Sequence, residues 1–307
     1  MQNLAQLVDI LGRQTPTDGS HRCPLPGVKL IRSSSPTMPM PVIYEPTLCL
    51  VAQGRKRAML GNSSYVYDPT SYLIASVDLP VMGSVIEATP DRPYLCLQID
   101  LDMDVLGEMI VRYPPRSSQQ PAKAAGLSLN RTTPPLLDAA IRLARLLETP
   151  EDIDALAPLA MSEILYRLLS GESGATIRQM AQSDSRLNQI ARAIVWIKTH
   201  FRDACPIEMA AEIAGMSRST FHVHFKATTS LSPLEYRTHL RLQEAQRLMV
   251  GSGLDAASAG FEVGYASPSQ FSRDYSRIFG MPPSKHVAGL KHEPASPSRR
   301  SERAAAA

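Results

Sequence analysis

Two stretches in the C-terminal third of the chain place hydroxyl, imidazole, amide and cationic side chains on one face of a predicted helix. They are SRSTFHVHFKATTSLSP, starting at Ser217, and SPSQFSRDYSRIFGMPP, starting at Ser267. The two stretches resemble each other at a constant offset of 50 residues. Side chains of these types can reach base edges and phosphates in the major groove of duplex DNA. The repeat therefore indicates two nucleic-acid-reading helices.

Helical periodicity divides each stretch into two faces. Apolar and aromatic residues recur at i, i+4 and i+7, as expected of a face packed on another helix; these are Phe221, Phe225 and Thr228, then Phe271, Tyr275 and Ile278. The candidate DNA-contacting residues lie at the remaining positions: Arg218, Ser219, His222, Val223 and Lys226 in the first copy, and Ser267, Ser269, Gln270, Ser272, Arg273 and Arg277 in the second. Arg273 is the strongest candidate for a two-pronged contact to guanine, worth about 1–3 kcal/mol of discrimination.

The elements before each stretch complete a helix-turn-helix pattern. A short helix of small residues ends at Gly215 before the first copy and at Gly264 before the second, and each following helix should begin at a serine N-cap. We expect helix-turn-helix units at about 206–229 and 255–280. A single helix at 232–249 should join them and set the spacing of the two reading helices, which need about 34 Å to follow one face of the DNA.

A polar helix face is more often simply solvated than functional, and a basic surface need not bind anything. The repeat with its glycine turns shifts the balance toward DNA. The charge distribution agrees, because residues 185–292 hold 13 Lys/Arg and 8 Asp/Glu, a balance of +5, whereas residues 1–184 have a balance of −3.

The rest of the chain is typical of a globular protein that folds in two domains. Short β-prone runs bounded by turn residues cover 47–100 and predict a β-barrel or sandwich after a proline-rich extended segment at 24–46. Helices are expected at 104–113, 134–148 and 153–171, then a small, polar linker at 171–185 and a disordered tail at 293–307. The start of the chain, 1–21, is interpreted as a helix and lead-in. No signal peptide or transmembrane run is recognisable, and four widely spaced cysteines suit a reducing cytosol.

The C-terminal stretches resemble the AraC/XylS family of bacterial transcription regulators over about residues 187–290. The second copy carries the family's G-Y-x-S-x-S-Q-F-S-R run, followed by Phe279-Gly280 and Pro283. The resemblance implies a seven-helix DNA-binding domain at 186–292. It also implies that Arg273 reads bases, as do Ser219, His222 and Val223, although these three are shorter or less polar than is usual in the family.

Residues 22–110 resemble the N-terminal domain of a subgroup of these regulators, through YEPTLCLVAQGRKRAMLG, YDPTSYLIASVDLPVMG and EATPDRPYLCLQID. This implies a cupin-like β-barrel for a small-molecule effector, followed by dimerising helices, within 22–170. A barrel of that size can hold one small ligand. The candidate effector-binding residues are Tyr44, Gln53, Arg55, Tyr72 and Tyr94. Cys49 and Cys96 are either buried small hydrophobes or reactive sensor thiols.

The expected protein is thus an α+β regulator with a cupin-like barrel and dimerising helices, then an all-α domain with two helix-turn-helix units. Its expected partners are double-stranded DNA, a small-molecule effector and a second copy, with RNA polymerase as a further candidate, in the bacterial cytoplasm and on the nucleoid. Activation is favoured by the resemblance alone. The alternatives are a cupin-like ligand-binding protein or an enzyme whose helical domain does not read DNA. A metal-dependent enzyme is disfavoured because His21 is the one histidine before residue 200. We expect no cofactor, metal site or catalytic residue.

Overall fold

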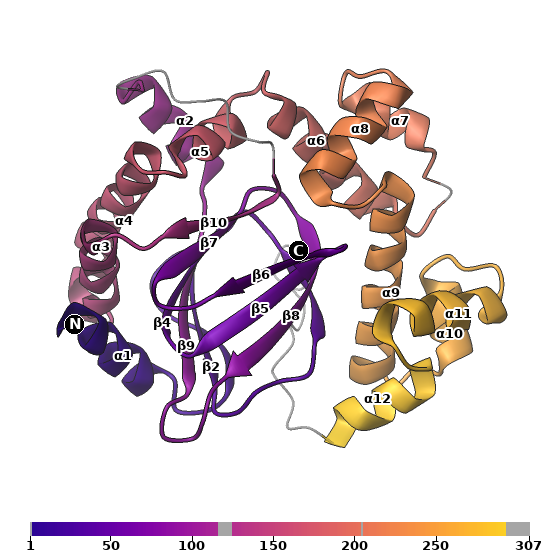
Figure 1. Ribbon diagram of the computed structural model, residues 1–307, viewed down its shortest axis with the longest axis horizontal. Helices are drawn as coiled ribbons and strands as arrows, with labels where there is room; N and C mark the ends of the chain where they lie inside the picture. Colours follow the sequence, from indigo (N-terminus) through magenta and orange to yellow (C-terminus); the bar gives the residue numbers. More distant parts are fainter. Residues whose placement is uncertain (1, 116–124, 204, 293–307) are drawn as a thin grey trace, which may run out of the picture. The chain divides into compact units, whose positions relative to one another are not determined.

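The computed structural model describes residues 2–115, 125–203 and 205–292 (Figure 1). Packing divides the chain into two units. Unit 1 comprises 1–199 and 206–236, and unit 2 comprises 200–205 and 237–307. The β-rich N-terminal region followed by a helical region confirms the expected α+β, two-part fold.

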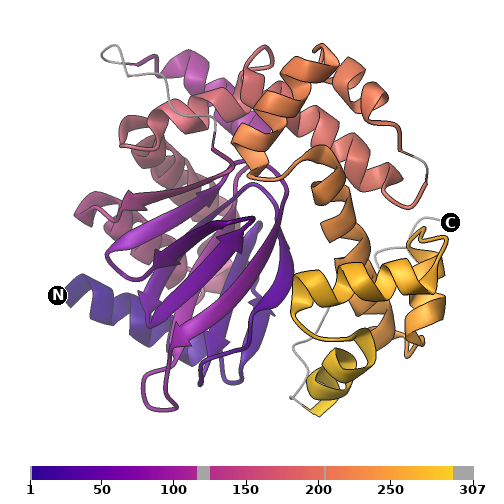
Figure 2. The same ribbon diagram turned by 45° about the vertical axis from the view of Figure 1, so that its right-hand side comes forward.

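Two antiparallel sheets form the centre of unit 1. The six-stranded sheet has the order β1-β2-β9-β4-β7-β10, with β1 at Gly19–Arg22, β2 at Val28–Ser33, β9 at Tyr94–Asp100, β4 at Thr47–Gln53, β7 at Ser71–Ala75 and β10 at Leu127–Arg131. The four-stranded sheet has the order β3-β8-β5-β6, with β3 at Met40–Tyr44, β8 at Leu79–Glu87, β5 at Arg55–Leu60 and β6 at Ser63–Tyr67. The two sheets are stacked face to face (Figure 2). The strands of the described residues therefore form a sandwich of two sheets, one of the two forms that the strand pattern predicted, and not the closed barrel that the family resemblance implied.

The six strands expected between 47 and 100 are all present, but strands also form on either side of that range. The proline-rich segment holds β2 and β3, where an extended lead-in without strand pairing was expected. Pro41 is compatible with β3 because β3 lies at the edge of its sheet, where a missing backbone N–H leaves no ladder bond unmade on the solvent side.

A layer of helices covers the outer face of the six-stranded sheet. Helix α1, Gln2–Gln14, buries Leu7, Ile10 and Leu11 and packs against β2, β4 and β9. This explains why six consecutive residues of β4, from Thr47 to Ala52, are buried, since one face meets the other sheet and the other meets α1. Helix α3, Pro134–Arg145, packs on α1 and on α4, Ile153–Ser170, with the short 3-10 turn Pro150–Asp152 between α3 and α4.

The segment expected to be a linker, 171–185, contains a helix. Helix α5, Gly174–Ala181, buries Ile177 and Met180 and packs on α4 and on α2, Met103–Arg112. The polar composition of the segment was misleading, because two apolar side chains three residues apart are enough to anchor a short helix on its neighbours. Because α5 packs on α4 and α2, residues 171–185 belong to unit 1 and are not a free linker.

Seven helices follow in the described part of 186–292, as expected: α6 Arg186–His200, α7 Ile207–Ile213, α8 Arg218–Thr229, α9 Pro233–Gly251, α10 Ala256–Glu262, α11 Pro268–Phe279 and α12 Pro283–His292. Packing groups them differently from the sequence division, because α7 and α8 belong to unit 1. The contacts of α8 within unit 1 include a hydrogen bond from the Gly126 backbone N–H to the Thr228 carbonyl (2.7 Å). Its neighbours α6 and α9 are joined to the sheets by an ion pair of Lys198 Nζ with Asp78 (2.5 Å) and a hydrogen bond from the Tyr236 hydroxyl to the Asp78 carbonyl (2.6 Å). The expected tail at 293–307 lies outside the described residues.

Among the helices that the structure describes, none is long and apolar enough to cross a membrane.

The glycines of the two helix-helix turns differ in what surrounds them. Both have a left-handed backbone, with φ of +67° at Gly215 and +87° at Gly264. A Cβ at Gly215 would meet nothing within 4 Å, whereas a Cβ at Gly264 would lie 2.0 Å from the Arg202 carbonyl oxygen. Gly215 is therefore required by conformation alone, and Gly264 by conformation and by close approach of another backbone segment.

We expect Gly215→Ala to lower the free energy of unfolding by about 1–2 kcal/mol, the cost of a left-handed alanine. Gly264→Ala should cost clearly more, because the backbone at Arg202 must also move. Urea unfolding of the full chain, followed by circular dichroism, measures both. Equal losses for the two variants would contradict this account of the second turn.

Candidate nucleic-acid interface and interior cluster

The two predicted helix-turn-helix units are present, and each consists of a short helix, a glycine turn and a longer helix. The first is α7 and α8 with Gly215 between them, and the second is α10 and α11 with Gly264 between them. Their ranges match the expected 206–229 and 255–280. The short helices bury small residues, such as Ala210 and Ala259, so that the longer helix can approach closely.

Each longer helix is fixed by two aromatic rings four residues apart. Phe221 and Phe225 are completely buried, with ring centroids 5.2 Å apart, and Phe225 also meets Tyr236 edge-on at 5.4 Å. In unit 2, Phe271 and Tyr275 are equally buried, with centroids 5.5 Å apart, in a core that includes Leu242, Val263 and Tyr265. The inward faces predicted from periodicity are thus correct, apart from Ile278, which is only partly buried.

The opposite faces are exposed along most of their length. In α8, the side chains of Arg218, Ser219, Val223 and Lys226 are exposed and His222 is half-buried. Beside α11, Ser267 is half-buried, and the exposed side chains are Ser269, Gln270, Ser272, Arg273 and Arg277. All eleven side chains predicted from the sequence therefore lie on or beside an accessible helix face, five at α8 and six at α11.

The cations on these faces differ in how they are held. Arg218 forms an ion pair with Glu208 (2.9 Å), and Arg277 forms one with Asp274 (2.9 Å). Arg273 has only a weak contact from its Nε to the backbone carbonyl of Ser269 (3.3 Å), one turn earlier. The Arg273 side chain is exposed. Of the two arginines on α11, Arg273 thus makes the weaker contact with the rest of the protein.

The two reading helices also differ in the hydrogen bonding of their N-cap residues. The Ser217 hydroxyl accepts a hydrogen bond from the Thr220 backbone N–H (3.3 Å), which satisfies a free donor of the first turn. Ser267 occupies the same position in α11 but makes no such bond, and Pro268 follows it directly. A serine therefore stands at the N-cap of both helices, as expected, but of the two only Ser217 makes the cap hydrogen bond with its hydroxyl. Proline at the first helical position has no N–H, which removes one of the first-turn donors that have no partner within the helix.

The interior of the sandwich holds a group of polar side chains, which we call the interior cluster. Its members are Tyr44, Cys49, Lys56, Tyr67, Tyr94 and Cys96. The Tyr44 and Tyr67 hydroxyls are 3.1 Å apart, and the Lys56 Nζ lies 5.6 Å from the centre of the Tyr44 ring and 6.0 Å from that of Tyr94. Side chains from both sheets therefore meet at one place, with a cation among aromatic rings.

Two of the five predicted effector-binding residues, Tyr44 and Tyr94, belong to this cluster. Tyr72 faces the helical layer instead, and its hydroxyl donates to Ser173 Oγ (3.1 Å). Arg55 is exposed on the outer face of β5, near Asp68 and Glu87 (3.7 and 3.6 Å), and the Gln53 amide donates to the Pro93 carbonyl (2.9 Å). The structure thus does not bring Tyr72, Arg55 and Gln53 together with the other two.

Sequence reasoning missed Lys56, although strand alternation could have found it. In RKRAML, the residues Ala58 and Leu60 are buried and Arg55, Arg57 and Met59 are exposed, which places Lys56 on the inward face. Burial alone would lower the pKa of Lys56, but the combined effect of Tyr44, Cys49 and Cys96 outweighs it and raises that pKa. Lys56 is therefore a cation at neutral pH.

Cys49 and Cys96 are buried, with 2% and 0% of their surface exposed. They lie on the same face of adjacent strands, because Cys49 pairs with Gln98 and Cys96 with Val51. The neighbouring Cys96 and burial both raise the pKa of Cys49. Burial of this degree is typical of unreactive thiols, and a sensor role stays a hypothesis. No group of three or more metal-ligating side chains is present among the described residues.

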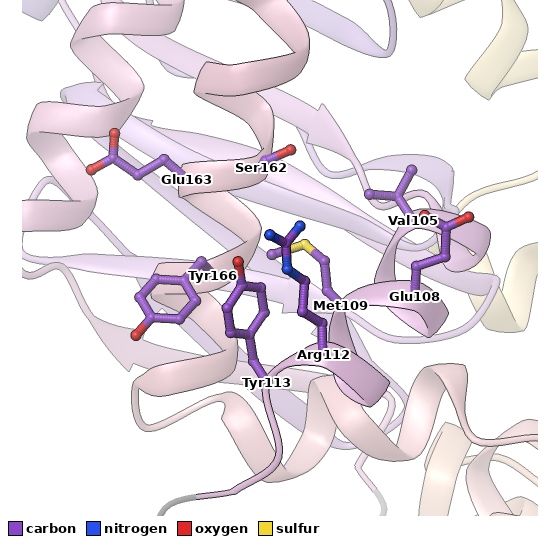
Figure 3. Close-up of a pocket in the computed structure, with 8 residues that line it drawn as sticks. All are labelled: Val105, Glu108, Met109, Arg112, Tyr113, Ser162, Glu163 and Tyr166. Carbon is purple, nitrogen blue, oxygen red and sulfur yellow. The ribbon is translucent and has the colours of Figure 1, made fainter.

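A second hollow lies in the helical layer of unit 1. A pocket of about 360 Å³ opens between α2 and α4, and Figure 3 shows Arg112 and Met109 of α2 facing it across from Ser162 of α4. The rings of Tyr113 and Tyr166 meet edge-on at 5.1 Å at its side. Glu163 is committed elsewhere, because hydrogen bonds from Arg142 and Arg167 lower the pKa of its carboxyl.

The chain matches two protein-family models. Residues 24–176 match the AraC-type transcriptional regulator N-terminus, and residues 210–288 match a helix-turn-helix domain. Among curated proteins, a putative AraC-like transcription regulator of Streptomyces lividans is 42% identical over 73 residues, which is 24% of each chain. The RCS-specific HTH-type transcriptional activator RclR of Escherichia coli is 32% identical over 123 residues, 40% of this chain and 37% of that protein. The chain thus spans well under half the length of these curated relatives.

Among solved structures, wild-type ToxT of Vibrio cholerae with a bound unsaturated fatty acid has a TM-score of 0.53 with this chain. The identity is 13%, over 85% of this chain and 93% of that one. At that identity the likeness concerns the fold, and it extends over both the sheet region and the helical region.

The two N-cap serines provide a matched test of the local structure. We expect Ser217→Ala to lower the free energy of unfolding by about 1 kcal/mol, because a first-turn N–H of α8 loses its acceptor. Ser267→Ala should change it by much less, since no such bond exists in α11. Urea midpoints of the two full-length variants measure the difference. A loss at Ser267 as large as that at Ser217 would show that Ser267 caps α11 after all.

Proposed function

Because this chain belongs to the AraC/XylS family of transcription regulators, we propose that it is a sequence-specific DNA-binding transcription regulator. The observation that carries the proposal is the division of α8 and α11 into two faces. In each helix a buried aromatic pair leaves the hydroxyl, imidazole, amide and cationic side chains accessible. Such a helix can enter a major groove without disturbing its own core.

We assign the two helices unequal roles in this proposal. Arg273 of α11, held only by a backbone carbonyl, reads bases, and the hydroxyls of Ser269 and Ser272 beside it contact base edges or phosphates. In α8, Arg218 is paired with Glu208 and Val223 is apolar and 67% exposed. The first unit therefore contributes more through phosphate contacts of Lys226 and apolar contact of Val223 than through hydrogen bonds to bases.

A test of base reading compares two arginines of α11. The probes are a duplex selected from random DNA by the full-length protein and an unselected duplex of equal length. Arg273→Ala should reduce the ratio of the two affinities by about 10-fold or more, because a two-pronged guanine contact is worth about 1–3 kcal/mol. Arg277→Ala should weaken both affinities alike, since it would act on the backbone of any sequence.

Titration at two salt concentrations belongs to the same experiment, because affinity that depends on phosphate contacts falls steeply with salt. If Arg273→Ala weakens the selected and unselected duplexes equally, Arg273 does not read bases. If neither duplex is bound by the wild-type protein at low salt, the proposed function itself is wrong.

We further propose that a small-molecule effector bound by unit 1 controls this activity, and that the protein activates transcription, through contact with RNA polymerase, in the bacterial cytoplasm. The matched N-terminal model and the activator RclR support this. A related fold, ToxT, has been solved with a fatty acid bound. The alternative of a sandwich enzyme with a non-reading helical region has no specific observation in its favour.

A homodimer formed through the helices of 132–170 is part of the proposal. Helix α4 presents Leu156 and Leu159, which are 44% and 66% exposed, and α2 presents Val111, which is 85% exposed, next to the pocket at Arg112. Large apolar side chains gathered on one layer are typical of a protein-protein interface.

We expect the full-length protein to sediment as a dimer at micromolar concentration and Leu159→Lys to sediment as a monomer, because a charge would be buried in the interface. Val195→Lys on α6, where Val195 is 57% exposed, is the matched control and should stay dimeric. A wild-type monomer, or a Leu159→Lys dimer, would place the interface elsewhere or remove it from the proposal.

A further inference from the structure

We propose that the interior cluster recognises the carboxylate of a small organic acid, with the Lys56 ammonium and the Tyr94 hydroxyl as its two donors. The apolar or aromatic body of the acid would lie against the rings of Tyr44 and Tyr67. This inference deepens the proposed effector control and rests on it.

Lys56 is a cation without a carboxylate partner. Other basic side chains of the two sheets form ion pairs, as Lys29 does with Asp100 (3.0 Å) and Arg32 with Asp18 (3.6 Å). Lys56 points inward from β5 and forms no ion pair with a carboxylate of the described residues; the groups beside it are tyrosine rings and thiols. A cation partly withdrawn from water without a counter-charge is costly, and an anionic ligand would remove that cost.

The Tyr94 hydroxyl is a second, independent sign of a missing partner. Tyr94 is 0% exposed, and no described atom meets hydrogen-bond geometry with its hydroxyl. The Cys96 sulfur is close enough to influence the pKa of Tyr94, and burial, the largest influence, raises that pKa and keeps the hydroxyl protonated. Buried polar groups are nearly always hydrogen-bonded. An orphan donor beside an unpaired ammonium therefore points to an acceptor that enters from outside.

A carboxylate fits these two donors better than other small ligands do. Its two oxygens can each accept from one donor, and charge-assisted bonds of this kind are stronger than neutral ones. The Tyr44 and Tyr67 hydroxyls already face each other at 3.1 Å, and their rings offer an apolar surface for the remainder of the molecule. Sugars and other neutral polyols would leave the charge of Lys56 uncompensated.

The packing around Lys56 allows its side chain to move. Lys56 is half-buried as a residue, and its stem runs past Gly83 of β8. A Cβ at Gly83 would lie 3.4 Å from Lys56 Cε, which shows how close the two strands bring the stem and the glycine. Entry of an acid requires the four-carbon stem to swing away from the two rings, a change of rotamer that leaves the strand in place.

The acidic groups beside Lys56 include the Cys49 and Cys96 thiols, and the pKa of Cys96 is lowered by a hydrogen bond with Cys49 and further by Tyr94 and Lys56. If the Cys96 thiolate were the permanent partner of Lys56, an added carboxylate would not bind. Cys96→Ala separates the two cases, because under the proposal it leaves carboxylate binding unchanged or strengthens it.

The test uses the full-length protein without DNA. The probes are benzoate, phenylacetate and hexanoate, each compared with its own amide, by isothermal titration calorimetry and by the shift of the thermal unfolding midpoint. We expect at least one acid to bind 10-fold or more tightly than its amide. Lys56→Met should abolish that preference, Lys56→Arg should keep part of it, and Arg57→Met, which removes a charge from the outer face of the same strand, should keep all of it.

Tyr94→Phe keeps the test decisive if Lys56→Met does not fold. It removes only an unpartnered hydroxyl, so it should not lower the unfolding midpoint but should weaken the acid about 5-fold or more. The proposal is overturned if no acid exceeds its amide, or if Lys56→Met and Tyr94→Phe bind as the wild type does. DNA binding is measured separately, with the duplexes described above. If the wild-type protein binds DNA but none of the acids, this site alone is refuted. If it binds an acid but no DNA, the proposed function is refuted.

Discussion

The structure of both reading helices depends on the burial of two aromatic rings, one helical turn apart, on each. Phe221 with Phe225, and Phe271 with Tyr275, are removed completely from water. Full burial of a large side chain is worth roughly 1.5–3 kcal/mol, so each pair is a strong determinant of how its helix is rotated about its own axis. Once that rotation is fixed, the side chains at the intervening positions must face outward. The chemistry offered to DNA is thus set by residues that never touch it.

In unit 1, too, most residues that stabilise the fold differ from those proposed to bind a ligand. Here the proposed binding residues face inward, whereas in the reading helices they face outward. There the strands present apolar residues and the interior cluster on their inward faces, while charged pairs such as Arg55 with Asp68 and Glu87 lie outside. The Lys56 ammonium lies over the rings of Tyr44 and Tyr94, but it has no carboxylate partner, and the Tyr94 hydroxyl has no hydrogen-bond partner among the described residues. Such groups are costly to bury, and a binding role explains why they lie in the interior.

The sequence predicted most of the fold because most of its elements have a strong local pattern. Six strands and the helices from α2 to α4 were predicted from alternation and periodicity, and the two helix-turn-helix units from a repeat. Strands β2 and β3 were missed because prolines obscure a strand pattern, although Pro41 is compatible with the edge of a sheet.

Helix α5 was missed because its packing, through Ile177 and Met180, depends on neighbours that lie elsewhere in the chain. For the interior cluster, Tyr44 and Tyr94 were predicted. Lys56 was missed because lysines normally lie on the solvent face of a strand, although it alternates in register with Ala58 and Leu60. Nor could the sequence show that Arg218 forms an ion pair with Glu208 whereas Arg273 contacts a backbone carbonyl.

The second helix-turn-helix unit has a hydrophobic core of its own, from Leu242 to Tyr275, whereas the first packs with the sandwich. In evolutionary terms, the two copies of one motif are under different constraints. Substitutions on the outer face of α11 leave that core unchanged, so a lineage can change the recognised sequence there without disturbing the fold of unit 2. The first copy is bound to unit 1 by contacts such as the hydrogen bond from the Gly126 N–H to the Thr228 carbonyl, and its divergence has to stay compatible with them. Regulators of this build can therefore acquire new target genes chiefly through their C-terminal reader.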